Sequence, residues 1–242
     1  MFGLYDKEFI EEKANIKGIK YMLLYIGLII PYLVVRLISI IPLVNDFIFP
    51  TINYLPWFVG FFVRSVYYKQ KLRSIGQNVL IDVGVIVTNP ENVTIGNNSH
   101  IDTYVKIEGG TNGYVEIGDY CHIAPLNVIQ GEGGLKIKNY VGIAAGCKIY
   151  SGSNYYKDPT SKKKVLSMSA SAPKEMQHII RKEIIIDNFA FIGLNSVILP
   201  GIKIGERAVV GAGSCVMRDI PSKTLAVGCP AKVINKIEYQ NE

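Results

Sequence analysis

The sequence predicts a mainly β protein whose short parallel strands wind into a solenoid, preceded by an apolar helical segment. The first observation behind this prediction is a six-residue repeat that runs from about residue 75 onward and begins each hexad with Ile or Val. A period of six fits neither the 3.6 residues of an α-helix nor the two of a single strand. The second observation is that residues 21–63 contain only two full charges, Arg36 and Asp46. The two regions therefore require different surroundings.

The hexads group into triplets, and each triplet is closed by a third aliphatic residue. The triplets begin at Ile75, Ile95, Ile117, Ile137, Ile186 and Ile204. We interpret one hexad as one face of a triangular prism, so that about six coils stack on one another. The first and fifth residues of a hexad point inward, and the second, often Gly or Asp, lies at a tight corner. Stacked coils bury a continuous aliphatic column, which a single repeat could not do.

Composition narrows the classes of partner. The net charge of +6 is modest, and no basic helix with interleaved aromatic residues is present, so we expect no nucleic acid. An anionic membrane surface or a phosphorylated ligand suits this charge better. The four cysteines have no CxxC spacing, so we expect them to be reduced and the protein to hold no metal.

The amino-terminal part divides into a charged segment, residues 1–20, and a hydrophobic helical segment with its connector, residues 21–74. The apolar run at 21–44 is long enough to cross ~30 Å of hydrocarbon, and a second run follows at 47–63. Prolines interrupt both runs, which favours shallow or re-entrant helices over two straight spans.

Basic residues flank the two apolar runs on their outer sides: Lys13, Lys17, Lys20, Arg64, Lys69, Lys71 and Arg73. Because basic flanks stay in the cytoplasm, we expect an anchor that enters and returns on the cytoplasmic face of the membrane. The alternative is a buried helical cap on the following domain, or an oligomer interface.

Two stretches carry a resemblance to a known family. The run "FIGLNSVILPGIKIGERAVVGAGSCVMRDIPSKTLAVGCPAKVI" resembles the ending of the hexapeptide-repeat acyltransferases, with Phe191 where the family has Trp and Cys229 where it has Asn. The run "HIAPLNVIQGEGGLKIKNYVGIAAGCKIYSGSNYYKDP" is most similar to acetyltransferases that modify sugars of bacterial surface polysaccharides. The resemblance implies a left-handed parallel β-helix over residues 75–221, a homotrimer, and acetyl-CoA as acyl donor. We expect the tail, residues 222–242, to include a short helix.

Insertions interrupt the hexads at three places, residues 108–114, 130–135 and 152–183. Loops that leave a solenoid can reach a neighbouring subunit. In the family, a loop at the third place folds over the active-site cleft of the adjacent subunit. We therefore interpret 152–183 as a mobile lid, with a merely tolerated insertion as the alternative.

Acyl transfer to a hydroxyl or an amine needs a general base, and histidine is the natural candidate. His100 and His122 are both the sixth residue of a hexad in consecutive coils. They should therefore point outward from the same face, about 4.8 Å apart. His178 lies in the large insertion.

The resemblance bears on which histidine is the base. Many family members place it where this chain has Ser153 and Asn154, neither of which can serve. Some related acetyltransferases carry a histidine that matches "DYCHIA", which favours His122. Asn154 or Asp102 would then orient the acceptor or the imidazole. The alternatives are His100 as base, and a packing role for His122.

The donor site follows from the resemblance and from charge. A pantetheine arm along the β-helix needs small residues, which Gly193, Ala212 and Gly213 supply. The CoA phosphates need cations near the end of the solenoid, and the candidates are Arg218, Lys223, Lys232 and Lys236.

These features predict an acetyltransferase that moves an acetyl group from acetyl-CoA to a hydroxyl or amine of a nucleotide-linked or lipid-linked sugar. The apolar segment favours the lipid-linked acceptor. Direct attack is expected, because no cysteine is paired with a base. The alternatives are a non-catalytic trimeric scaffold in a membrane glycan-assembly complex, and a donor with a longer acyl chain.

Overall fold

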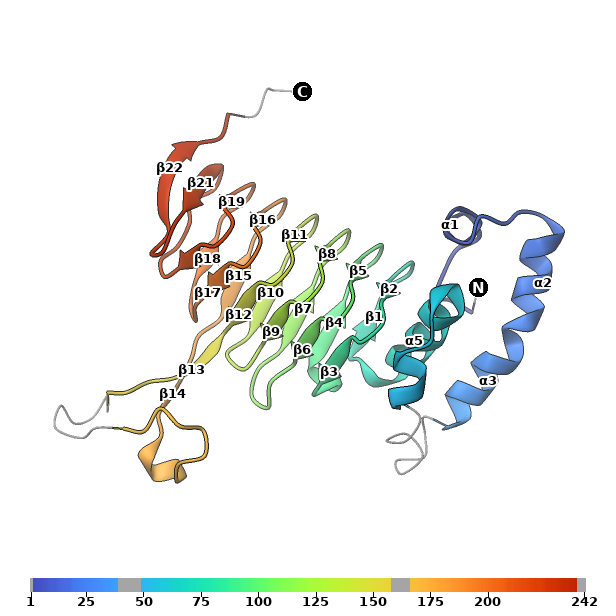
Figure 1. Ribbon diagram of the computed structural model, residues 1–242, viewed down its shortest axis with the longest axis horizontal. Coiled ribbons are helices and arrows are strands. Elements are labelled where there is room, and N and C mark those ends of the chain that lie inside the picture. Colours follow the sequence, from blue (N-terminus) through green and yellow to red (C-terminus); the bar gives the residue numbers. More distant parts are fainter. Residues whose placement is uncertain (1, 39–48, 158–165, 239–242) are drawn as a thin grey trace.

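The computed structural model describes residues 2–38, 49–157 and 166–238. It shows a parallel β-solenoid with helices gathered at its amino-terminal end (Figure 1). Each face of the prism is one sheet. Sheet A holds β1 (Ser74–Ile75), β4 (Val93–Ile95), β7 (Val115–Ile117), β10 (Leu135–Ile137), β15 (Ile184–Ile186) and β18 (Lys203–Ile204). Sheet B holds β2 (Leu80–Ile81), β5 (His100–Ile101), β8 (His122–Ile123), β11 (Gly142–Ile143), β16 (Phe191–Ile192), β19 (Val209–Val210), β21 (Thr224–Val227) and β22 (Lys232–Lys236). Sheet C holds β3 (Ile86–Thr88), β6 (Lys106–Glu108), β9 (Val128–Gln130), β12 (Lys148–Tyr150), β17 (Val197–Ile198) and β20 (Cys215–Val216).

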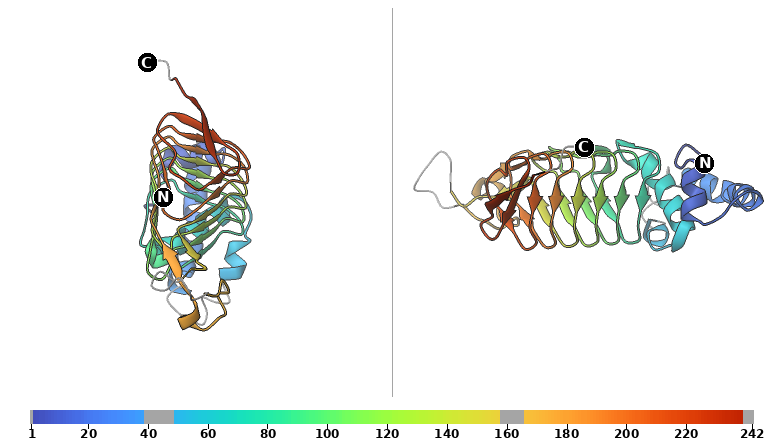
Figure 2. Two further views of the ribbon diagram at one scale, coloured as in Figure 1. Left: turned by 90° about the vertical axis from the view of Figure 1, so that its left-hand side faces the viewer. Right: turned by 90° about the horizontal axis from the view of Figure 1, so that it is seen from above.

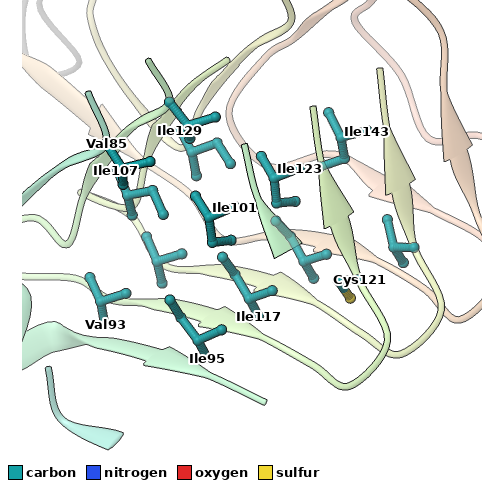
Figure 3. Packing of buried hydrophobic residues seen from close by; sticks show 14 of the residues in the cluster. Val85, Val93, Ile95, Ile101, Ile107, Ile117, Cys121, Ile123, Ile129 and Ile143 are labelled. Carbon is teal, nitrogen blue, oxygen red and sulfur yellow. The ribbon is translucent and has the colours of Figure 1, made fainter. Parts of the chain in front are cut away.

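The aliphatic residue that begins each hexad points into the prism, as the repeat predicts. In sheet B, Ile101 pairs in register with Ile123, and Ile123 with Ile143, and each is almost completely buried. Figure 3 shows these side chains packed together with Ile107 and Ile129 from sheet C. The column is continuous because the register is kept from turn to turn, so one hydrophobic core joins all the coils.

The carboxy-terminal end of the solenoid differs from the expectation. The strands make six complete turns, and β21 begins a seventh, in which Ala226 is fully buried below Val210 of the sixth turn. The expected short helix in residues 222–242 is absent from the part that the structure describes, up to residue 238. There the chain forms β22, which pairs antiparallel with β21. The exposed edge of β21 offers unpaired backbone groups, and a returning strand satisfies them.

The three insertions meet at one corner of the prism, and Glu132 of the second insertion joins them. Its carboxylate accepts hydrogen bonds from the backbone N–H of Thr111 (2.9 Å) and from the side chain of Asn112 (3.3 Å), both in the first insertion. It also accepts from Nε of Arg181 in the third insertion, at 2.8 Å. Burial alone would raise the pKa of Glu132, but these donors hold the pKa below its usual value.

The third insertion leaves the solenoid as a two-stranded stem, β13 (Gly152–Asn154) paired antiparallel with β14 (Ile179–Arg181). The stem projects from the body beside the fourth and fifth turns (Figure 1). Residues 158–165 lie outside the described residues. The role of this segment as a lid stays a prediction.

The amino-terminal helices are α1 (Lys7–Lys13), α2 (Ile19–Gly27), α3 (Ile29–Ile38) and α5 (Trp57–Lys71). Helix α5, which includes residues 57–63 of the second apolar run, packs on the first turn and buries Phe62, Val63 and Tyr68. The Tyr68 hydroxyl donates to the carbonyl of Val85 at 3.0 Å. Residues 57–63 of this run are therefore part of a cap on the solenoid, which was the alternative to an anchor.

Arg64 illustrates why the sequence misplaced this run. It was counted among the exposed basic flanks, but it is fully buried. Its Nε donates to the carbonyl of Ile81 at 2.7 Å and Nη1 donates to that of Leu55 at 2.7 Å. The charge of a buried guanidinium cannot reach a lipid headgroup. Arg64 instead donates to carbonyls of β2 and of the segment before α5, so it belongs to the cap.

Candidate active site

Two histidine and aspartate pairs lie one above the other on the outer face of sheet B. His100 and His122 are register partners on β5 and β8, as the spacing predicts. Their rings stack with centroids 5.2 Å apart and planes inclined by 18°. Nε2 of His100 lies 2.9 Å from Oδ2 of Asp82, and Nε2 of His122 lies 3.4 Å from Oδ2 of Asp102.

Each pair is built across two turns, because the aspartate comes from the turn that precedes its histidine. Asp82 and Asp102 both follow the buried isoleucine of their strand, and the N–H of Asp102 donates to the carbonyl of Ile123 in the next turn. The expectation that Asp102 lies beside the His122 imidazole is thus consistent with the contact. Asp82 was missed, although it occupies the same second position of a hexad one turn earlier.

The two histidines differ in access to solvent. The side chain of His122 is 55% exposed, whereas that of His100 is 34% exposed. An ionised carboxylate can only accept, so a proton on Nε2 that faces the aspartate leaves the lone pair on Nδ1. His122 is therefore the better placed of the two to take a proton from an incoming group.

The next position in the His122 column is Gly142 on β11. An added β-carbon on Gly142 would lie 3.1 Å from the ring of Phe191, which is its register partner on β16. The Phe191 ring thus covers the space that a side chain at 142 would fill. It forms a wall one strand away from the His122 imidazole.

The corner between sheets B and C changes character along the solenoid. One backbone ladder runs through equivalent positions of successive turns: Asp82, Asp102, Ala124, Ala144, Gly193 and Gly211. The first two positions are acidic, and the later four are small. We name the later four the small-residue corner. It begins in the same turn as His122 and leads toward the carboxy-terminal end.

The predicted donor residues are placed differently with respect to this corner. Gly193 belongs to it, and an added β-carbon there would lie 2.5 Å from the backbone nitrogen of Ala212. Gly213 follows with a φ of +68°. Among the cations, Lys232 pairs with Val227 next to Gly211, so it lies at the same corner.

The other predicted cations lie elsewhere. Lys223 is at the opposite edge of sheet B, in the turn that precedes β21, and Lys236 pairs with the adjacent Thr224. Arg218 follows β20 at the end of sheet C. Within one chain, the structure therefore brings Lys232 together with the small residues, but not Lys223 or Arg218.

Asn154 and His178 belong to the stem of the third insertion rather than to sheet B. The Asn154 side chain donates to the carbonyl of Met168 at 2.8 Å, and the carbonyl of His178 accepts from the N–H of Tyr155 at 2.8 Å. Because the stem follows sheet C, Asn154 and His122 lie on different faces of one chain. An orienting role for Asn154 then requires a neighbouring subunit.

The histidine cluster also bears on the expectation of no metal. Donor atoms of His100, Asp102 and His122 lie within 4.8 Å of one another. Imidazole nitrogens and a carboxylate are ligands that Zn²⁺ accepts. The absence of a metal from the working enzyme stays a prediction.

Comparisons with known proteins agree with this fold. A family model described as "Hexapeptide repeat of succinyl-transferase" matches residues 183–218. The chain is 34% identical over 164 residues to dTDP-4-amino-4,6-dideoxy-D-glucose acyltransferase from Escherichia coli, which covers 68% of this chain and 82% of that relative. It is 30% identical over 152 residues to the Escherichia coli K12 protein named "Putative lipopolysaccharide biosynthesis O-acetyl transferase WbbJ", covering 63% of this chain and 72% of that one.

Solved structures with the same fold include AntD, an N-acyltransferase from Bacillus cereus, in complex with dTDP and 3-hydroxybutyryl-CoA. The TM-score is 0.63 and the identity 28%, over 70% of this chain and 86% of AntD. A variant of AntD with dTDP-4-amino-4,6-dideoxyglucose and CoA gives a TM-score of 0.62 at 28% identity, over 71% and 87% of the two chains.

The extent of these similarities identifies the class of protein. The chain belongs to the family of hexapeptide-repeat acyltransferases. It is an acyl-CoA-dependent acyltransferase of that family.

Proposed function

We propose that the protein transfers an acetyl group from acetyl-CoA to a hydroxyl or amine of a sugar during assembly of a bacterial surface polysaccharide or glycolipid. The observation that carries this proposal is the position of the Asp102 and His122 pair, at the start of the small-residue corner. The proposal thus brings a base for the acceptor and a row of small residues for the donor together on one turn. The sugar-modifying relatives support the class of acceptor.

The reaction is a direct transfer. The acceptor oxygen or nitrogen attacks the thioester carbonyl carbon while Nδ1 of His122 takes the acceptor's proton. The carbon–sulfur bond then breaks, CoA leaves as the thiolate, and the proton passes from His122 to the leaving sulfur. Asp102 holds the imidazole in one tautomer and stabilises the imidazolium that forms. The acetyl group ends on the acceptor, and free CoA is the second product.

A covalent acyl-enzyme is disfavoured by the state of the nearest thiol. Cys121 precedes His122 but points into the core, and burial raises the pKa of its thiol to about 11. A thiol that stays protonated at neutral pH is a poor nucleophile. Transfer through a ternary complex of donor, acceptor and enzyme follows.

We also propose the quaternary arrangement that the family resemblance implies, a trimer of left-handed β-helices. The 55% exposure of the His122 side chain supports it, because one chain leaves the base open to water. In the trimer, the insertion of a neighbour, including its Asn154, would cover the acceptor site. Lys232 would bind the phosphates of CoA at the far end of the small-residue corner.

The proposed setting is the cytoplasmic face of the membrane. Residues 19–37 form a helix that is long and apolar enough to span a membrane, and only 11% of it is buried. The exposed lysines around this helix support the same setting.

Purified protein incubated with acetyl-CoA and a panel of amino and hydroxyl sugars on nucleotide diphosphates tests the function, with CoA release as the readout. Sugar-dependent CoA release and an acetylated sugar in mass spectrometry are expected. No transfer to any sugar, with CoA still bound, would overturn the proposal. Transfer of only a longer acyl group would correct the donor.

A further inference from the structure

The outer surface of the amino-terminal helical arm is a continuous aliphatic stripe. We define the arm as helices α2 and α3, which the bond from the N–H of Tyr32 to the carbonyl of Leu28 joins almost without interruption. Large apolar side chains exposed by 37% or more occur at Ile19, Met22, Leu23, Ile26, Ile29, Ile30, Leu33, Val34 and Leu37. Most of these positions follow steps of three and four, so they share one side of the arm. A monomeric soluble protein rarely exposes an apolar surface of this length.

The opposite side of the arm is held by the body of the protein. Leu28 and Val35 are buried in the common core, and Leu24 and Tyr32 pack against it. The ring of Phe2 stacks on that of Tyr32 with centroids 4.4 Å apart. A helix fixed along one side cannot be surrounded by lipid, so the arm is built to meet a bilayer with its outer side only.

The arm lies across the end of the solenoid. In Figure 1 it runs at a steep angle to the solenoid axis, beyond α5, and in the right view of Figure 2 it is seen nearly end-on at the same end of the molecule. Its aliphatic stripe therefore faces away from the strands. A flat surface touching this stripe would lie roughly perpendicular to the solenoid axis.

A groove next to the stripe indicates that the flat surface is lipid. The groove has a volume of about 490 Å³, and its lining is Ala14, Ile16, Lys20, Leu23, Leu24, Trp57, Phe58 and Val59. Leu23 belongs to both the groove and the stripe, and the Trp57 side chain is 86% exposed at the edge of the groove. Tryptophan at the border of an apolar surface is typical of the headgroup level of a bilayer.

Lys20 lines the groove, and Lys17 is exposed next to the lining residue Ile16. Lys13 is paired with Glu12 at 3.2 Å, so Lys17 and Lys20 supply the positive charge beside the groove. Lysines beside an apolar face attract anionic lipid headgroups, whereas they would oppose a second copy of the same basic surface. The charge thus favours an anionic bilayer over self-association as the occupant of this face.

We propose that the stripe and the groove are an in-plane docking surface for an anionic membrane, on which the solenoid stands upright with its first turn nearest the lipid. Strands repeat about every 4.8 Å, so His100 and His122 in the second and third turns stand only about 10 Å beyond the first. The fifth turn, with Gly193, and strand β22, with Lys232, point to the cytosol. This orientation, which rests on the proposed function, places the base where a sugar on a lipid diphosphate carrier can reach it. Soluble acetyl-CoA then arrives from the distal end.

The docking surface is tested with vesicles, because Trp57 is the single tryptophan of the chain. Phosphatidylcholine vesicles with and without one-third phosphatidylglycerol are mixed with the full-length protein and sedimented. Binding to the anionic vesicles and a blue shift of Trp57 emission are expected. Brominated lipids should quench Trp57 more strongly with bromine near the headgroup than near the end of the chain, and alkaline carbonate should release the protein.

The double variant Ile30→Glu/Leu33→Glu should reduce vesicle binding at least tenfold with the circular dichroism spectrum unchanged. The matched control is Ile234→Glu, whose side chain is 61% exposed on β22 and which should bind as the parent does. Three outcomes would overturn the proposal: retention after carbonate with deep quenching, which indicates a spanning helix; binding unaffected by the double variant; or a vesicle-free oligomer that the double variant dissociates, which indicates a second copy on this face.

The acceptor class has its own test, with one sugar carried either on a nucleotide diphosphate or on a polyprenyl diphosphate in vesicles. The double variant should lose at least tenfold in turnover on the lipid-linked sugar and keep its turnover on the soluble one. Equal loss on both, or no preference of the parent for the membrane, would overturn the lipid-linked assignment. If no sugar is acetylated in either form, the proposed function fails, but the vesicle result stands by itself.

Discussion

The two ends of sheet B use the same backbone positions for different chemistry. In the second and third turns, the outward residues of sheet B are His100 and His122. Their partners, Asp82 and Asp102, lie at the corner between sheets B and C, each one turn before its histidine. In the fifth and sixth turns, the equivalent positions are Phe191 and Val209, and the corner is glycine. The hydrogen-bond ladder is unbroken between the two, so backbone geometry does not distinguish them. The difference teaches that, in the proposed mechanism, side-chain choice alone separates the base from the site of the CoA phosphates.

Replacing the base should have the largest effect. His122→Asn preserves the approximate size and one hydrogen bond, but it cannot accept a proton at neutral pH. Turnover should fall by about 10²- to 10⁴-fold while affinity for CoA changes little, because the proposed site for the CoA phosphates lies at the other end of the sheet. His178→Asn, in the insertion, is the control and should matter far less. Near-normal turnover of His122→Asn would reject this residue as the base and direct attention to His100.

The two aspartates separate the roles of the stacked histidines. Asp102→Asn should lower turnover by roughly 10- to 100-fold, because the His122 ring loses the partner that fixes its tautomer. Asp82→Asn should cost less than tenfold if His100 only supports the stack. Steady-state kinetics of both variants decide the order. A larger defect in Asp82→Asn would exchange the assignments of the two pairs.

A substitution at a glycine of the small-residue corner should weaken donor binding rather than proton transfer. In Gly193→Val, the added β-carbon would meet the Ala212 nitrogen at 2.5 Å, so the corner must shift. Affinity for CoA should fall about tenfold, and the free energy of unfolding by about 1 to 3 kcal/mol. Calorimetric titration and thermal melting measure the two. Gly213→Asn is the control for stability alone, since the added side chain has open space and Asn tolerates positive φ. Its CoA affinity is not part of this control, because Gly213 is itself a predicted donor residue. Unchanged CoA affinity in Gly193→Val would place the donor elsewhere.

Removal of metal should have the smallest effect. Because proton transfer by His122 needs no cation, dialysis against EDTA should leave turnover unchanged. Added Zn²⁺ should inhibit if it occupies His100, Asp102 and His122, since it would compete with the acceptor's proton for the imidazole. Loss of turnover after EDTA, restored by a divalent ion, would make this cluster a metal site and not a simple base.

Periodicity determined the solenoid and, with it, the stacking of His100 on His122. Residues separated by one full turn must be register partners when every first hexad residue is buried, so this contact follows from counting. The resemblance named Gly193 for the donor, but the row of small residues to which Gly193 belongs was found only in the structure. The stacking of the two histidines is a local consequence of the repeat.

The tertiary structure decided what the repeat leaves open. Three features depend on contacts outside the hexads. They are the burial of Arg64 between α5 and the first turn, the contacts of Glu132 with Thr111 and Arg181, and the return of β22 in place of a helix. Hydropathy could not tell a cap from an anchor, because both are apolar helices and differ only in what covers them. The sequence encodes the period of the coil, but the partners of a group outside that period are set by the free energy of packing elements that lie far apart in the chain.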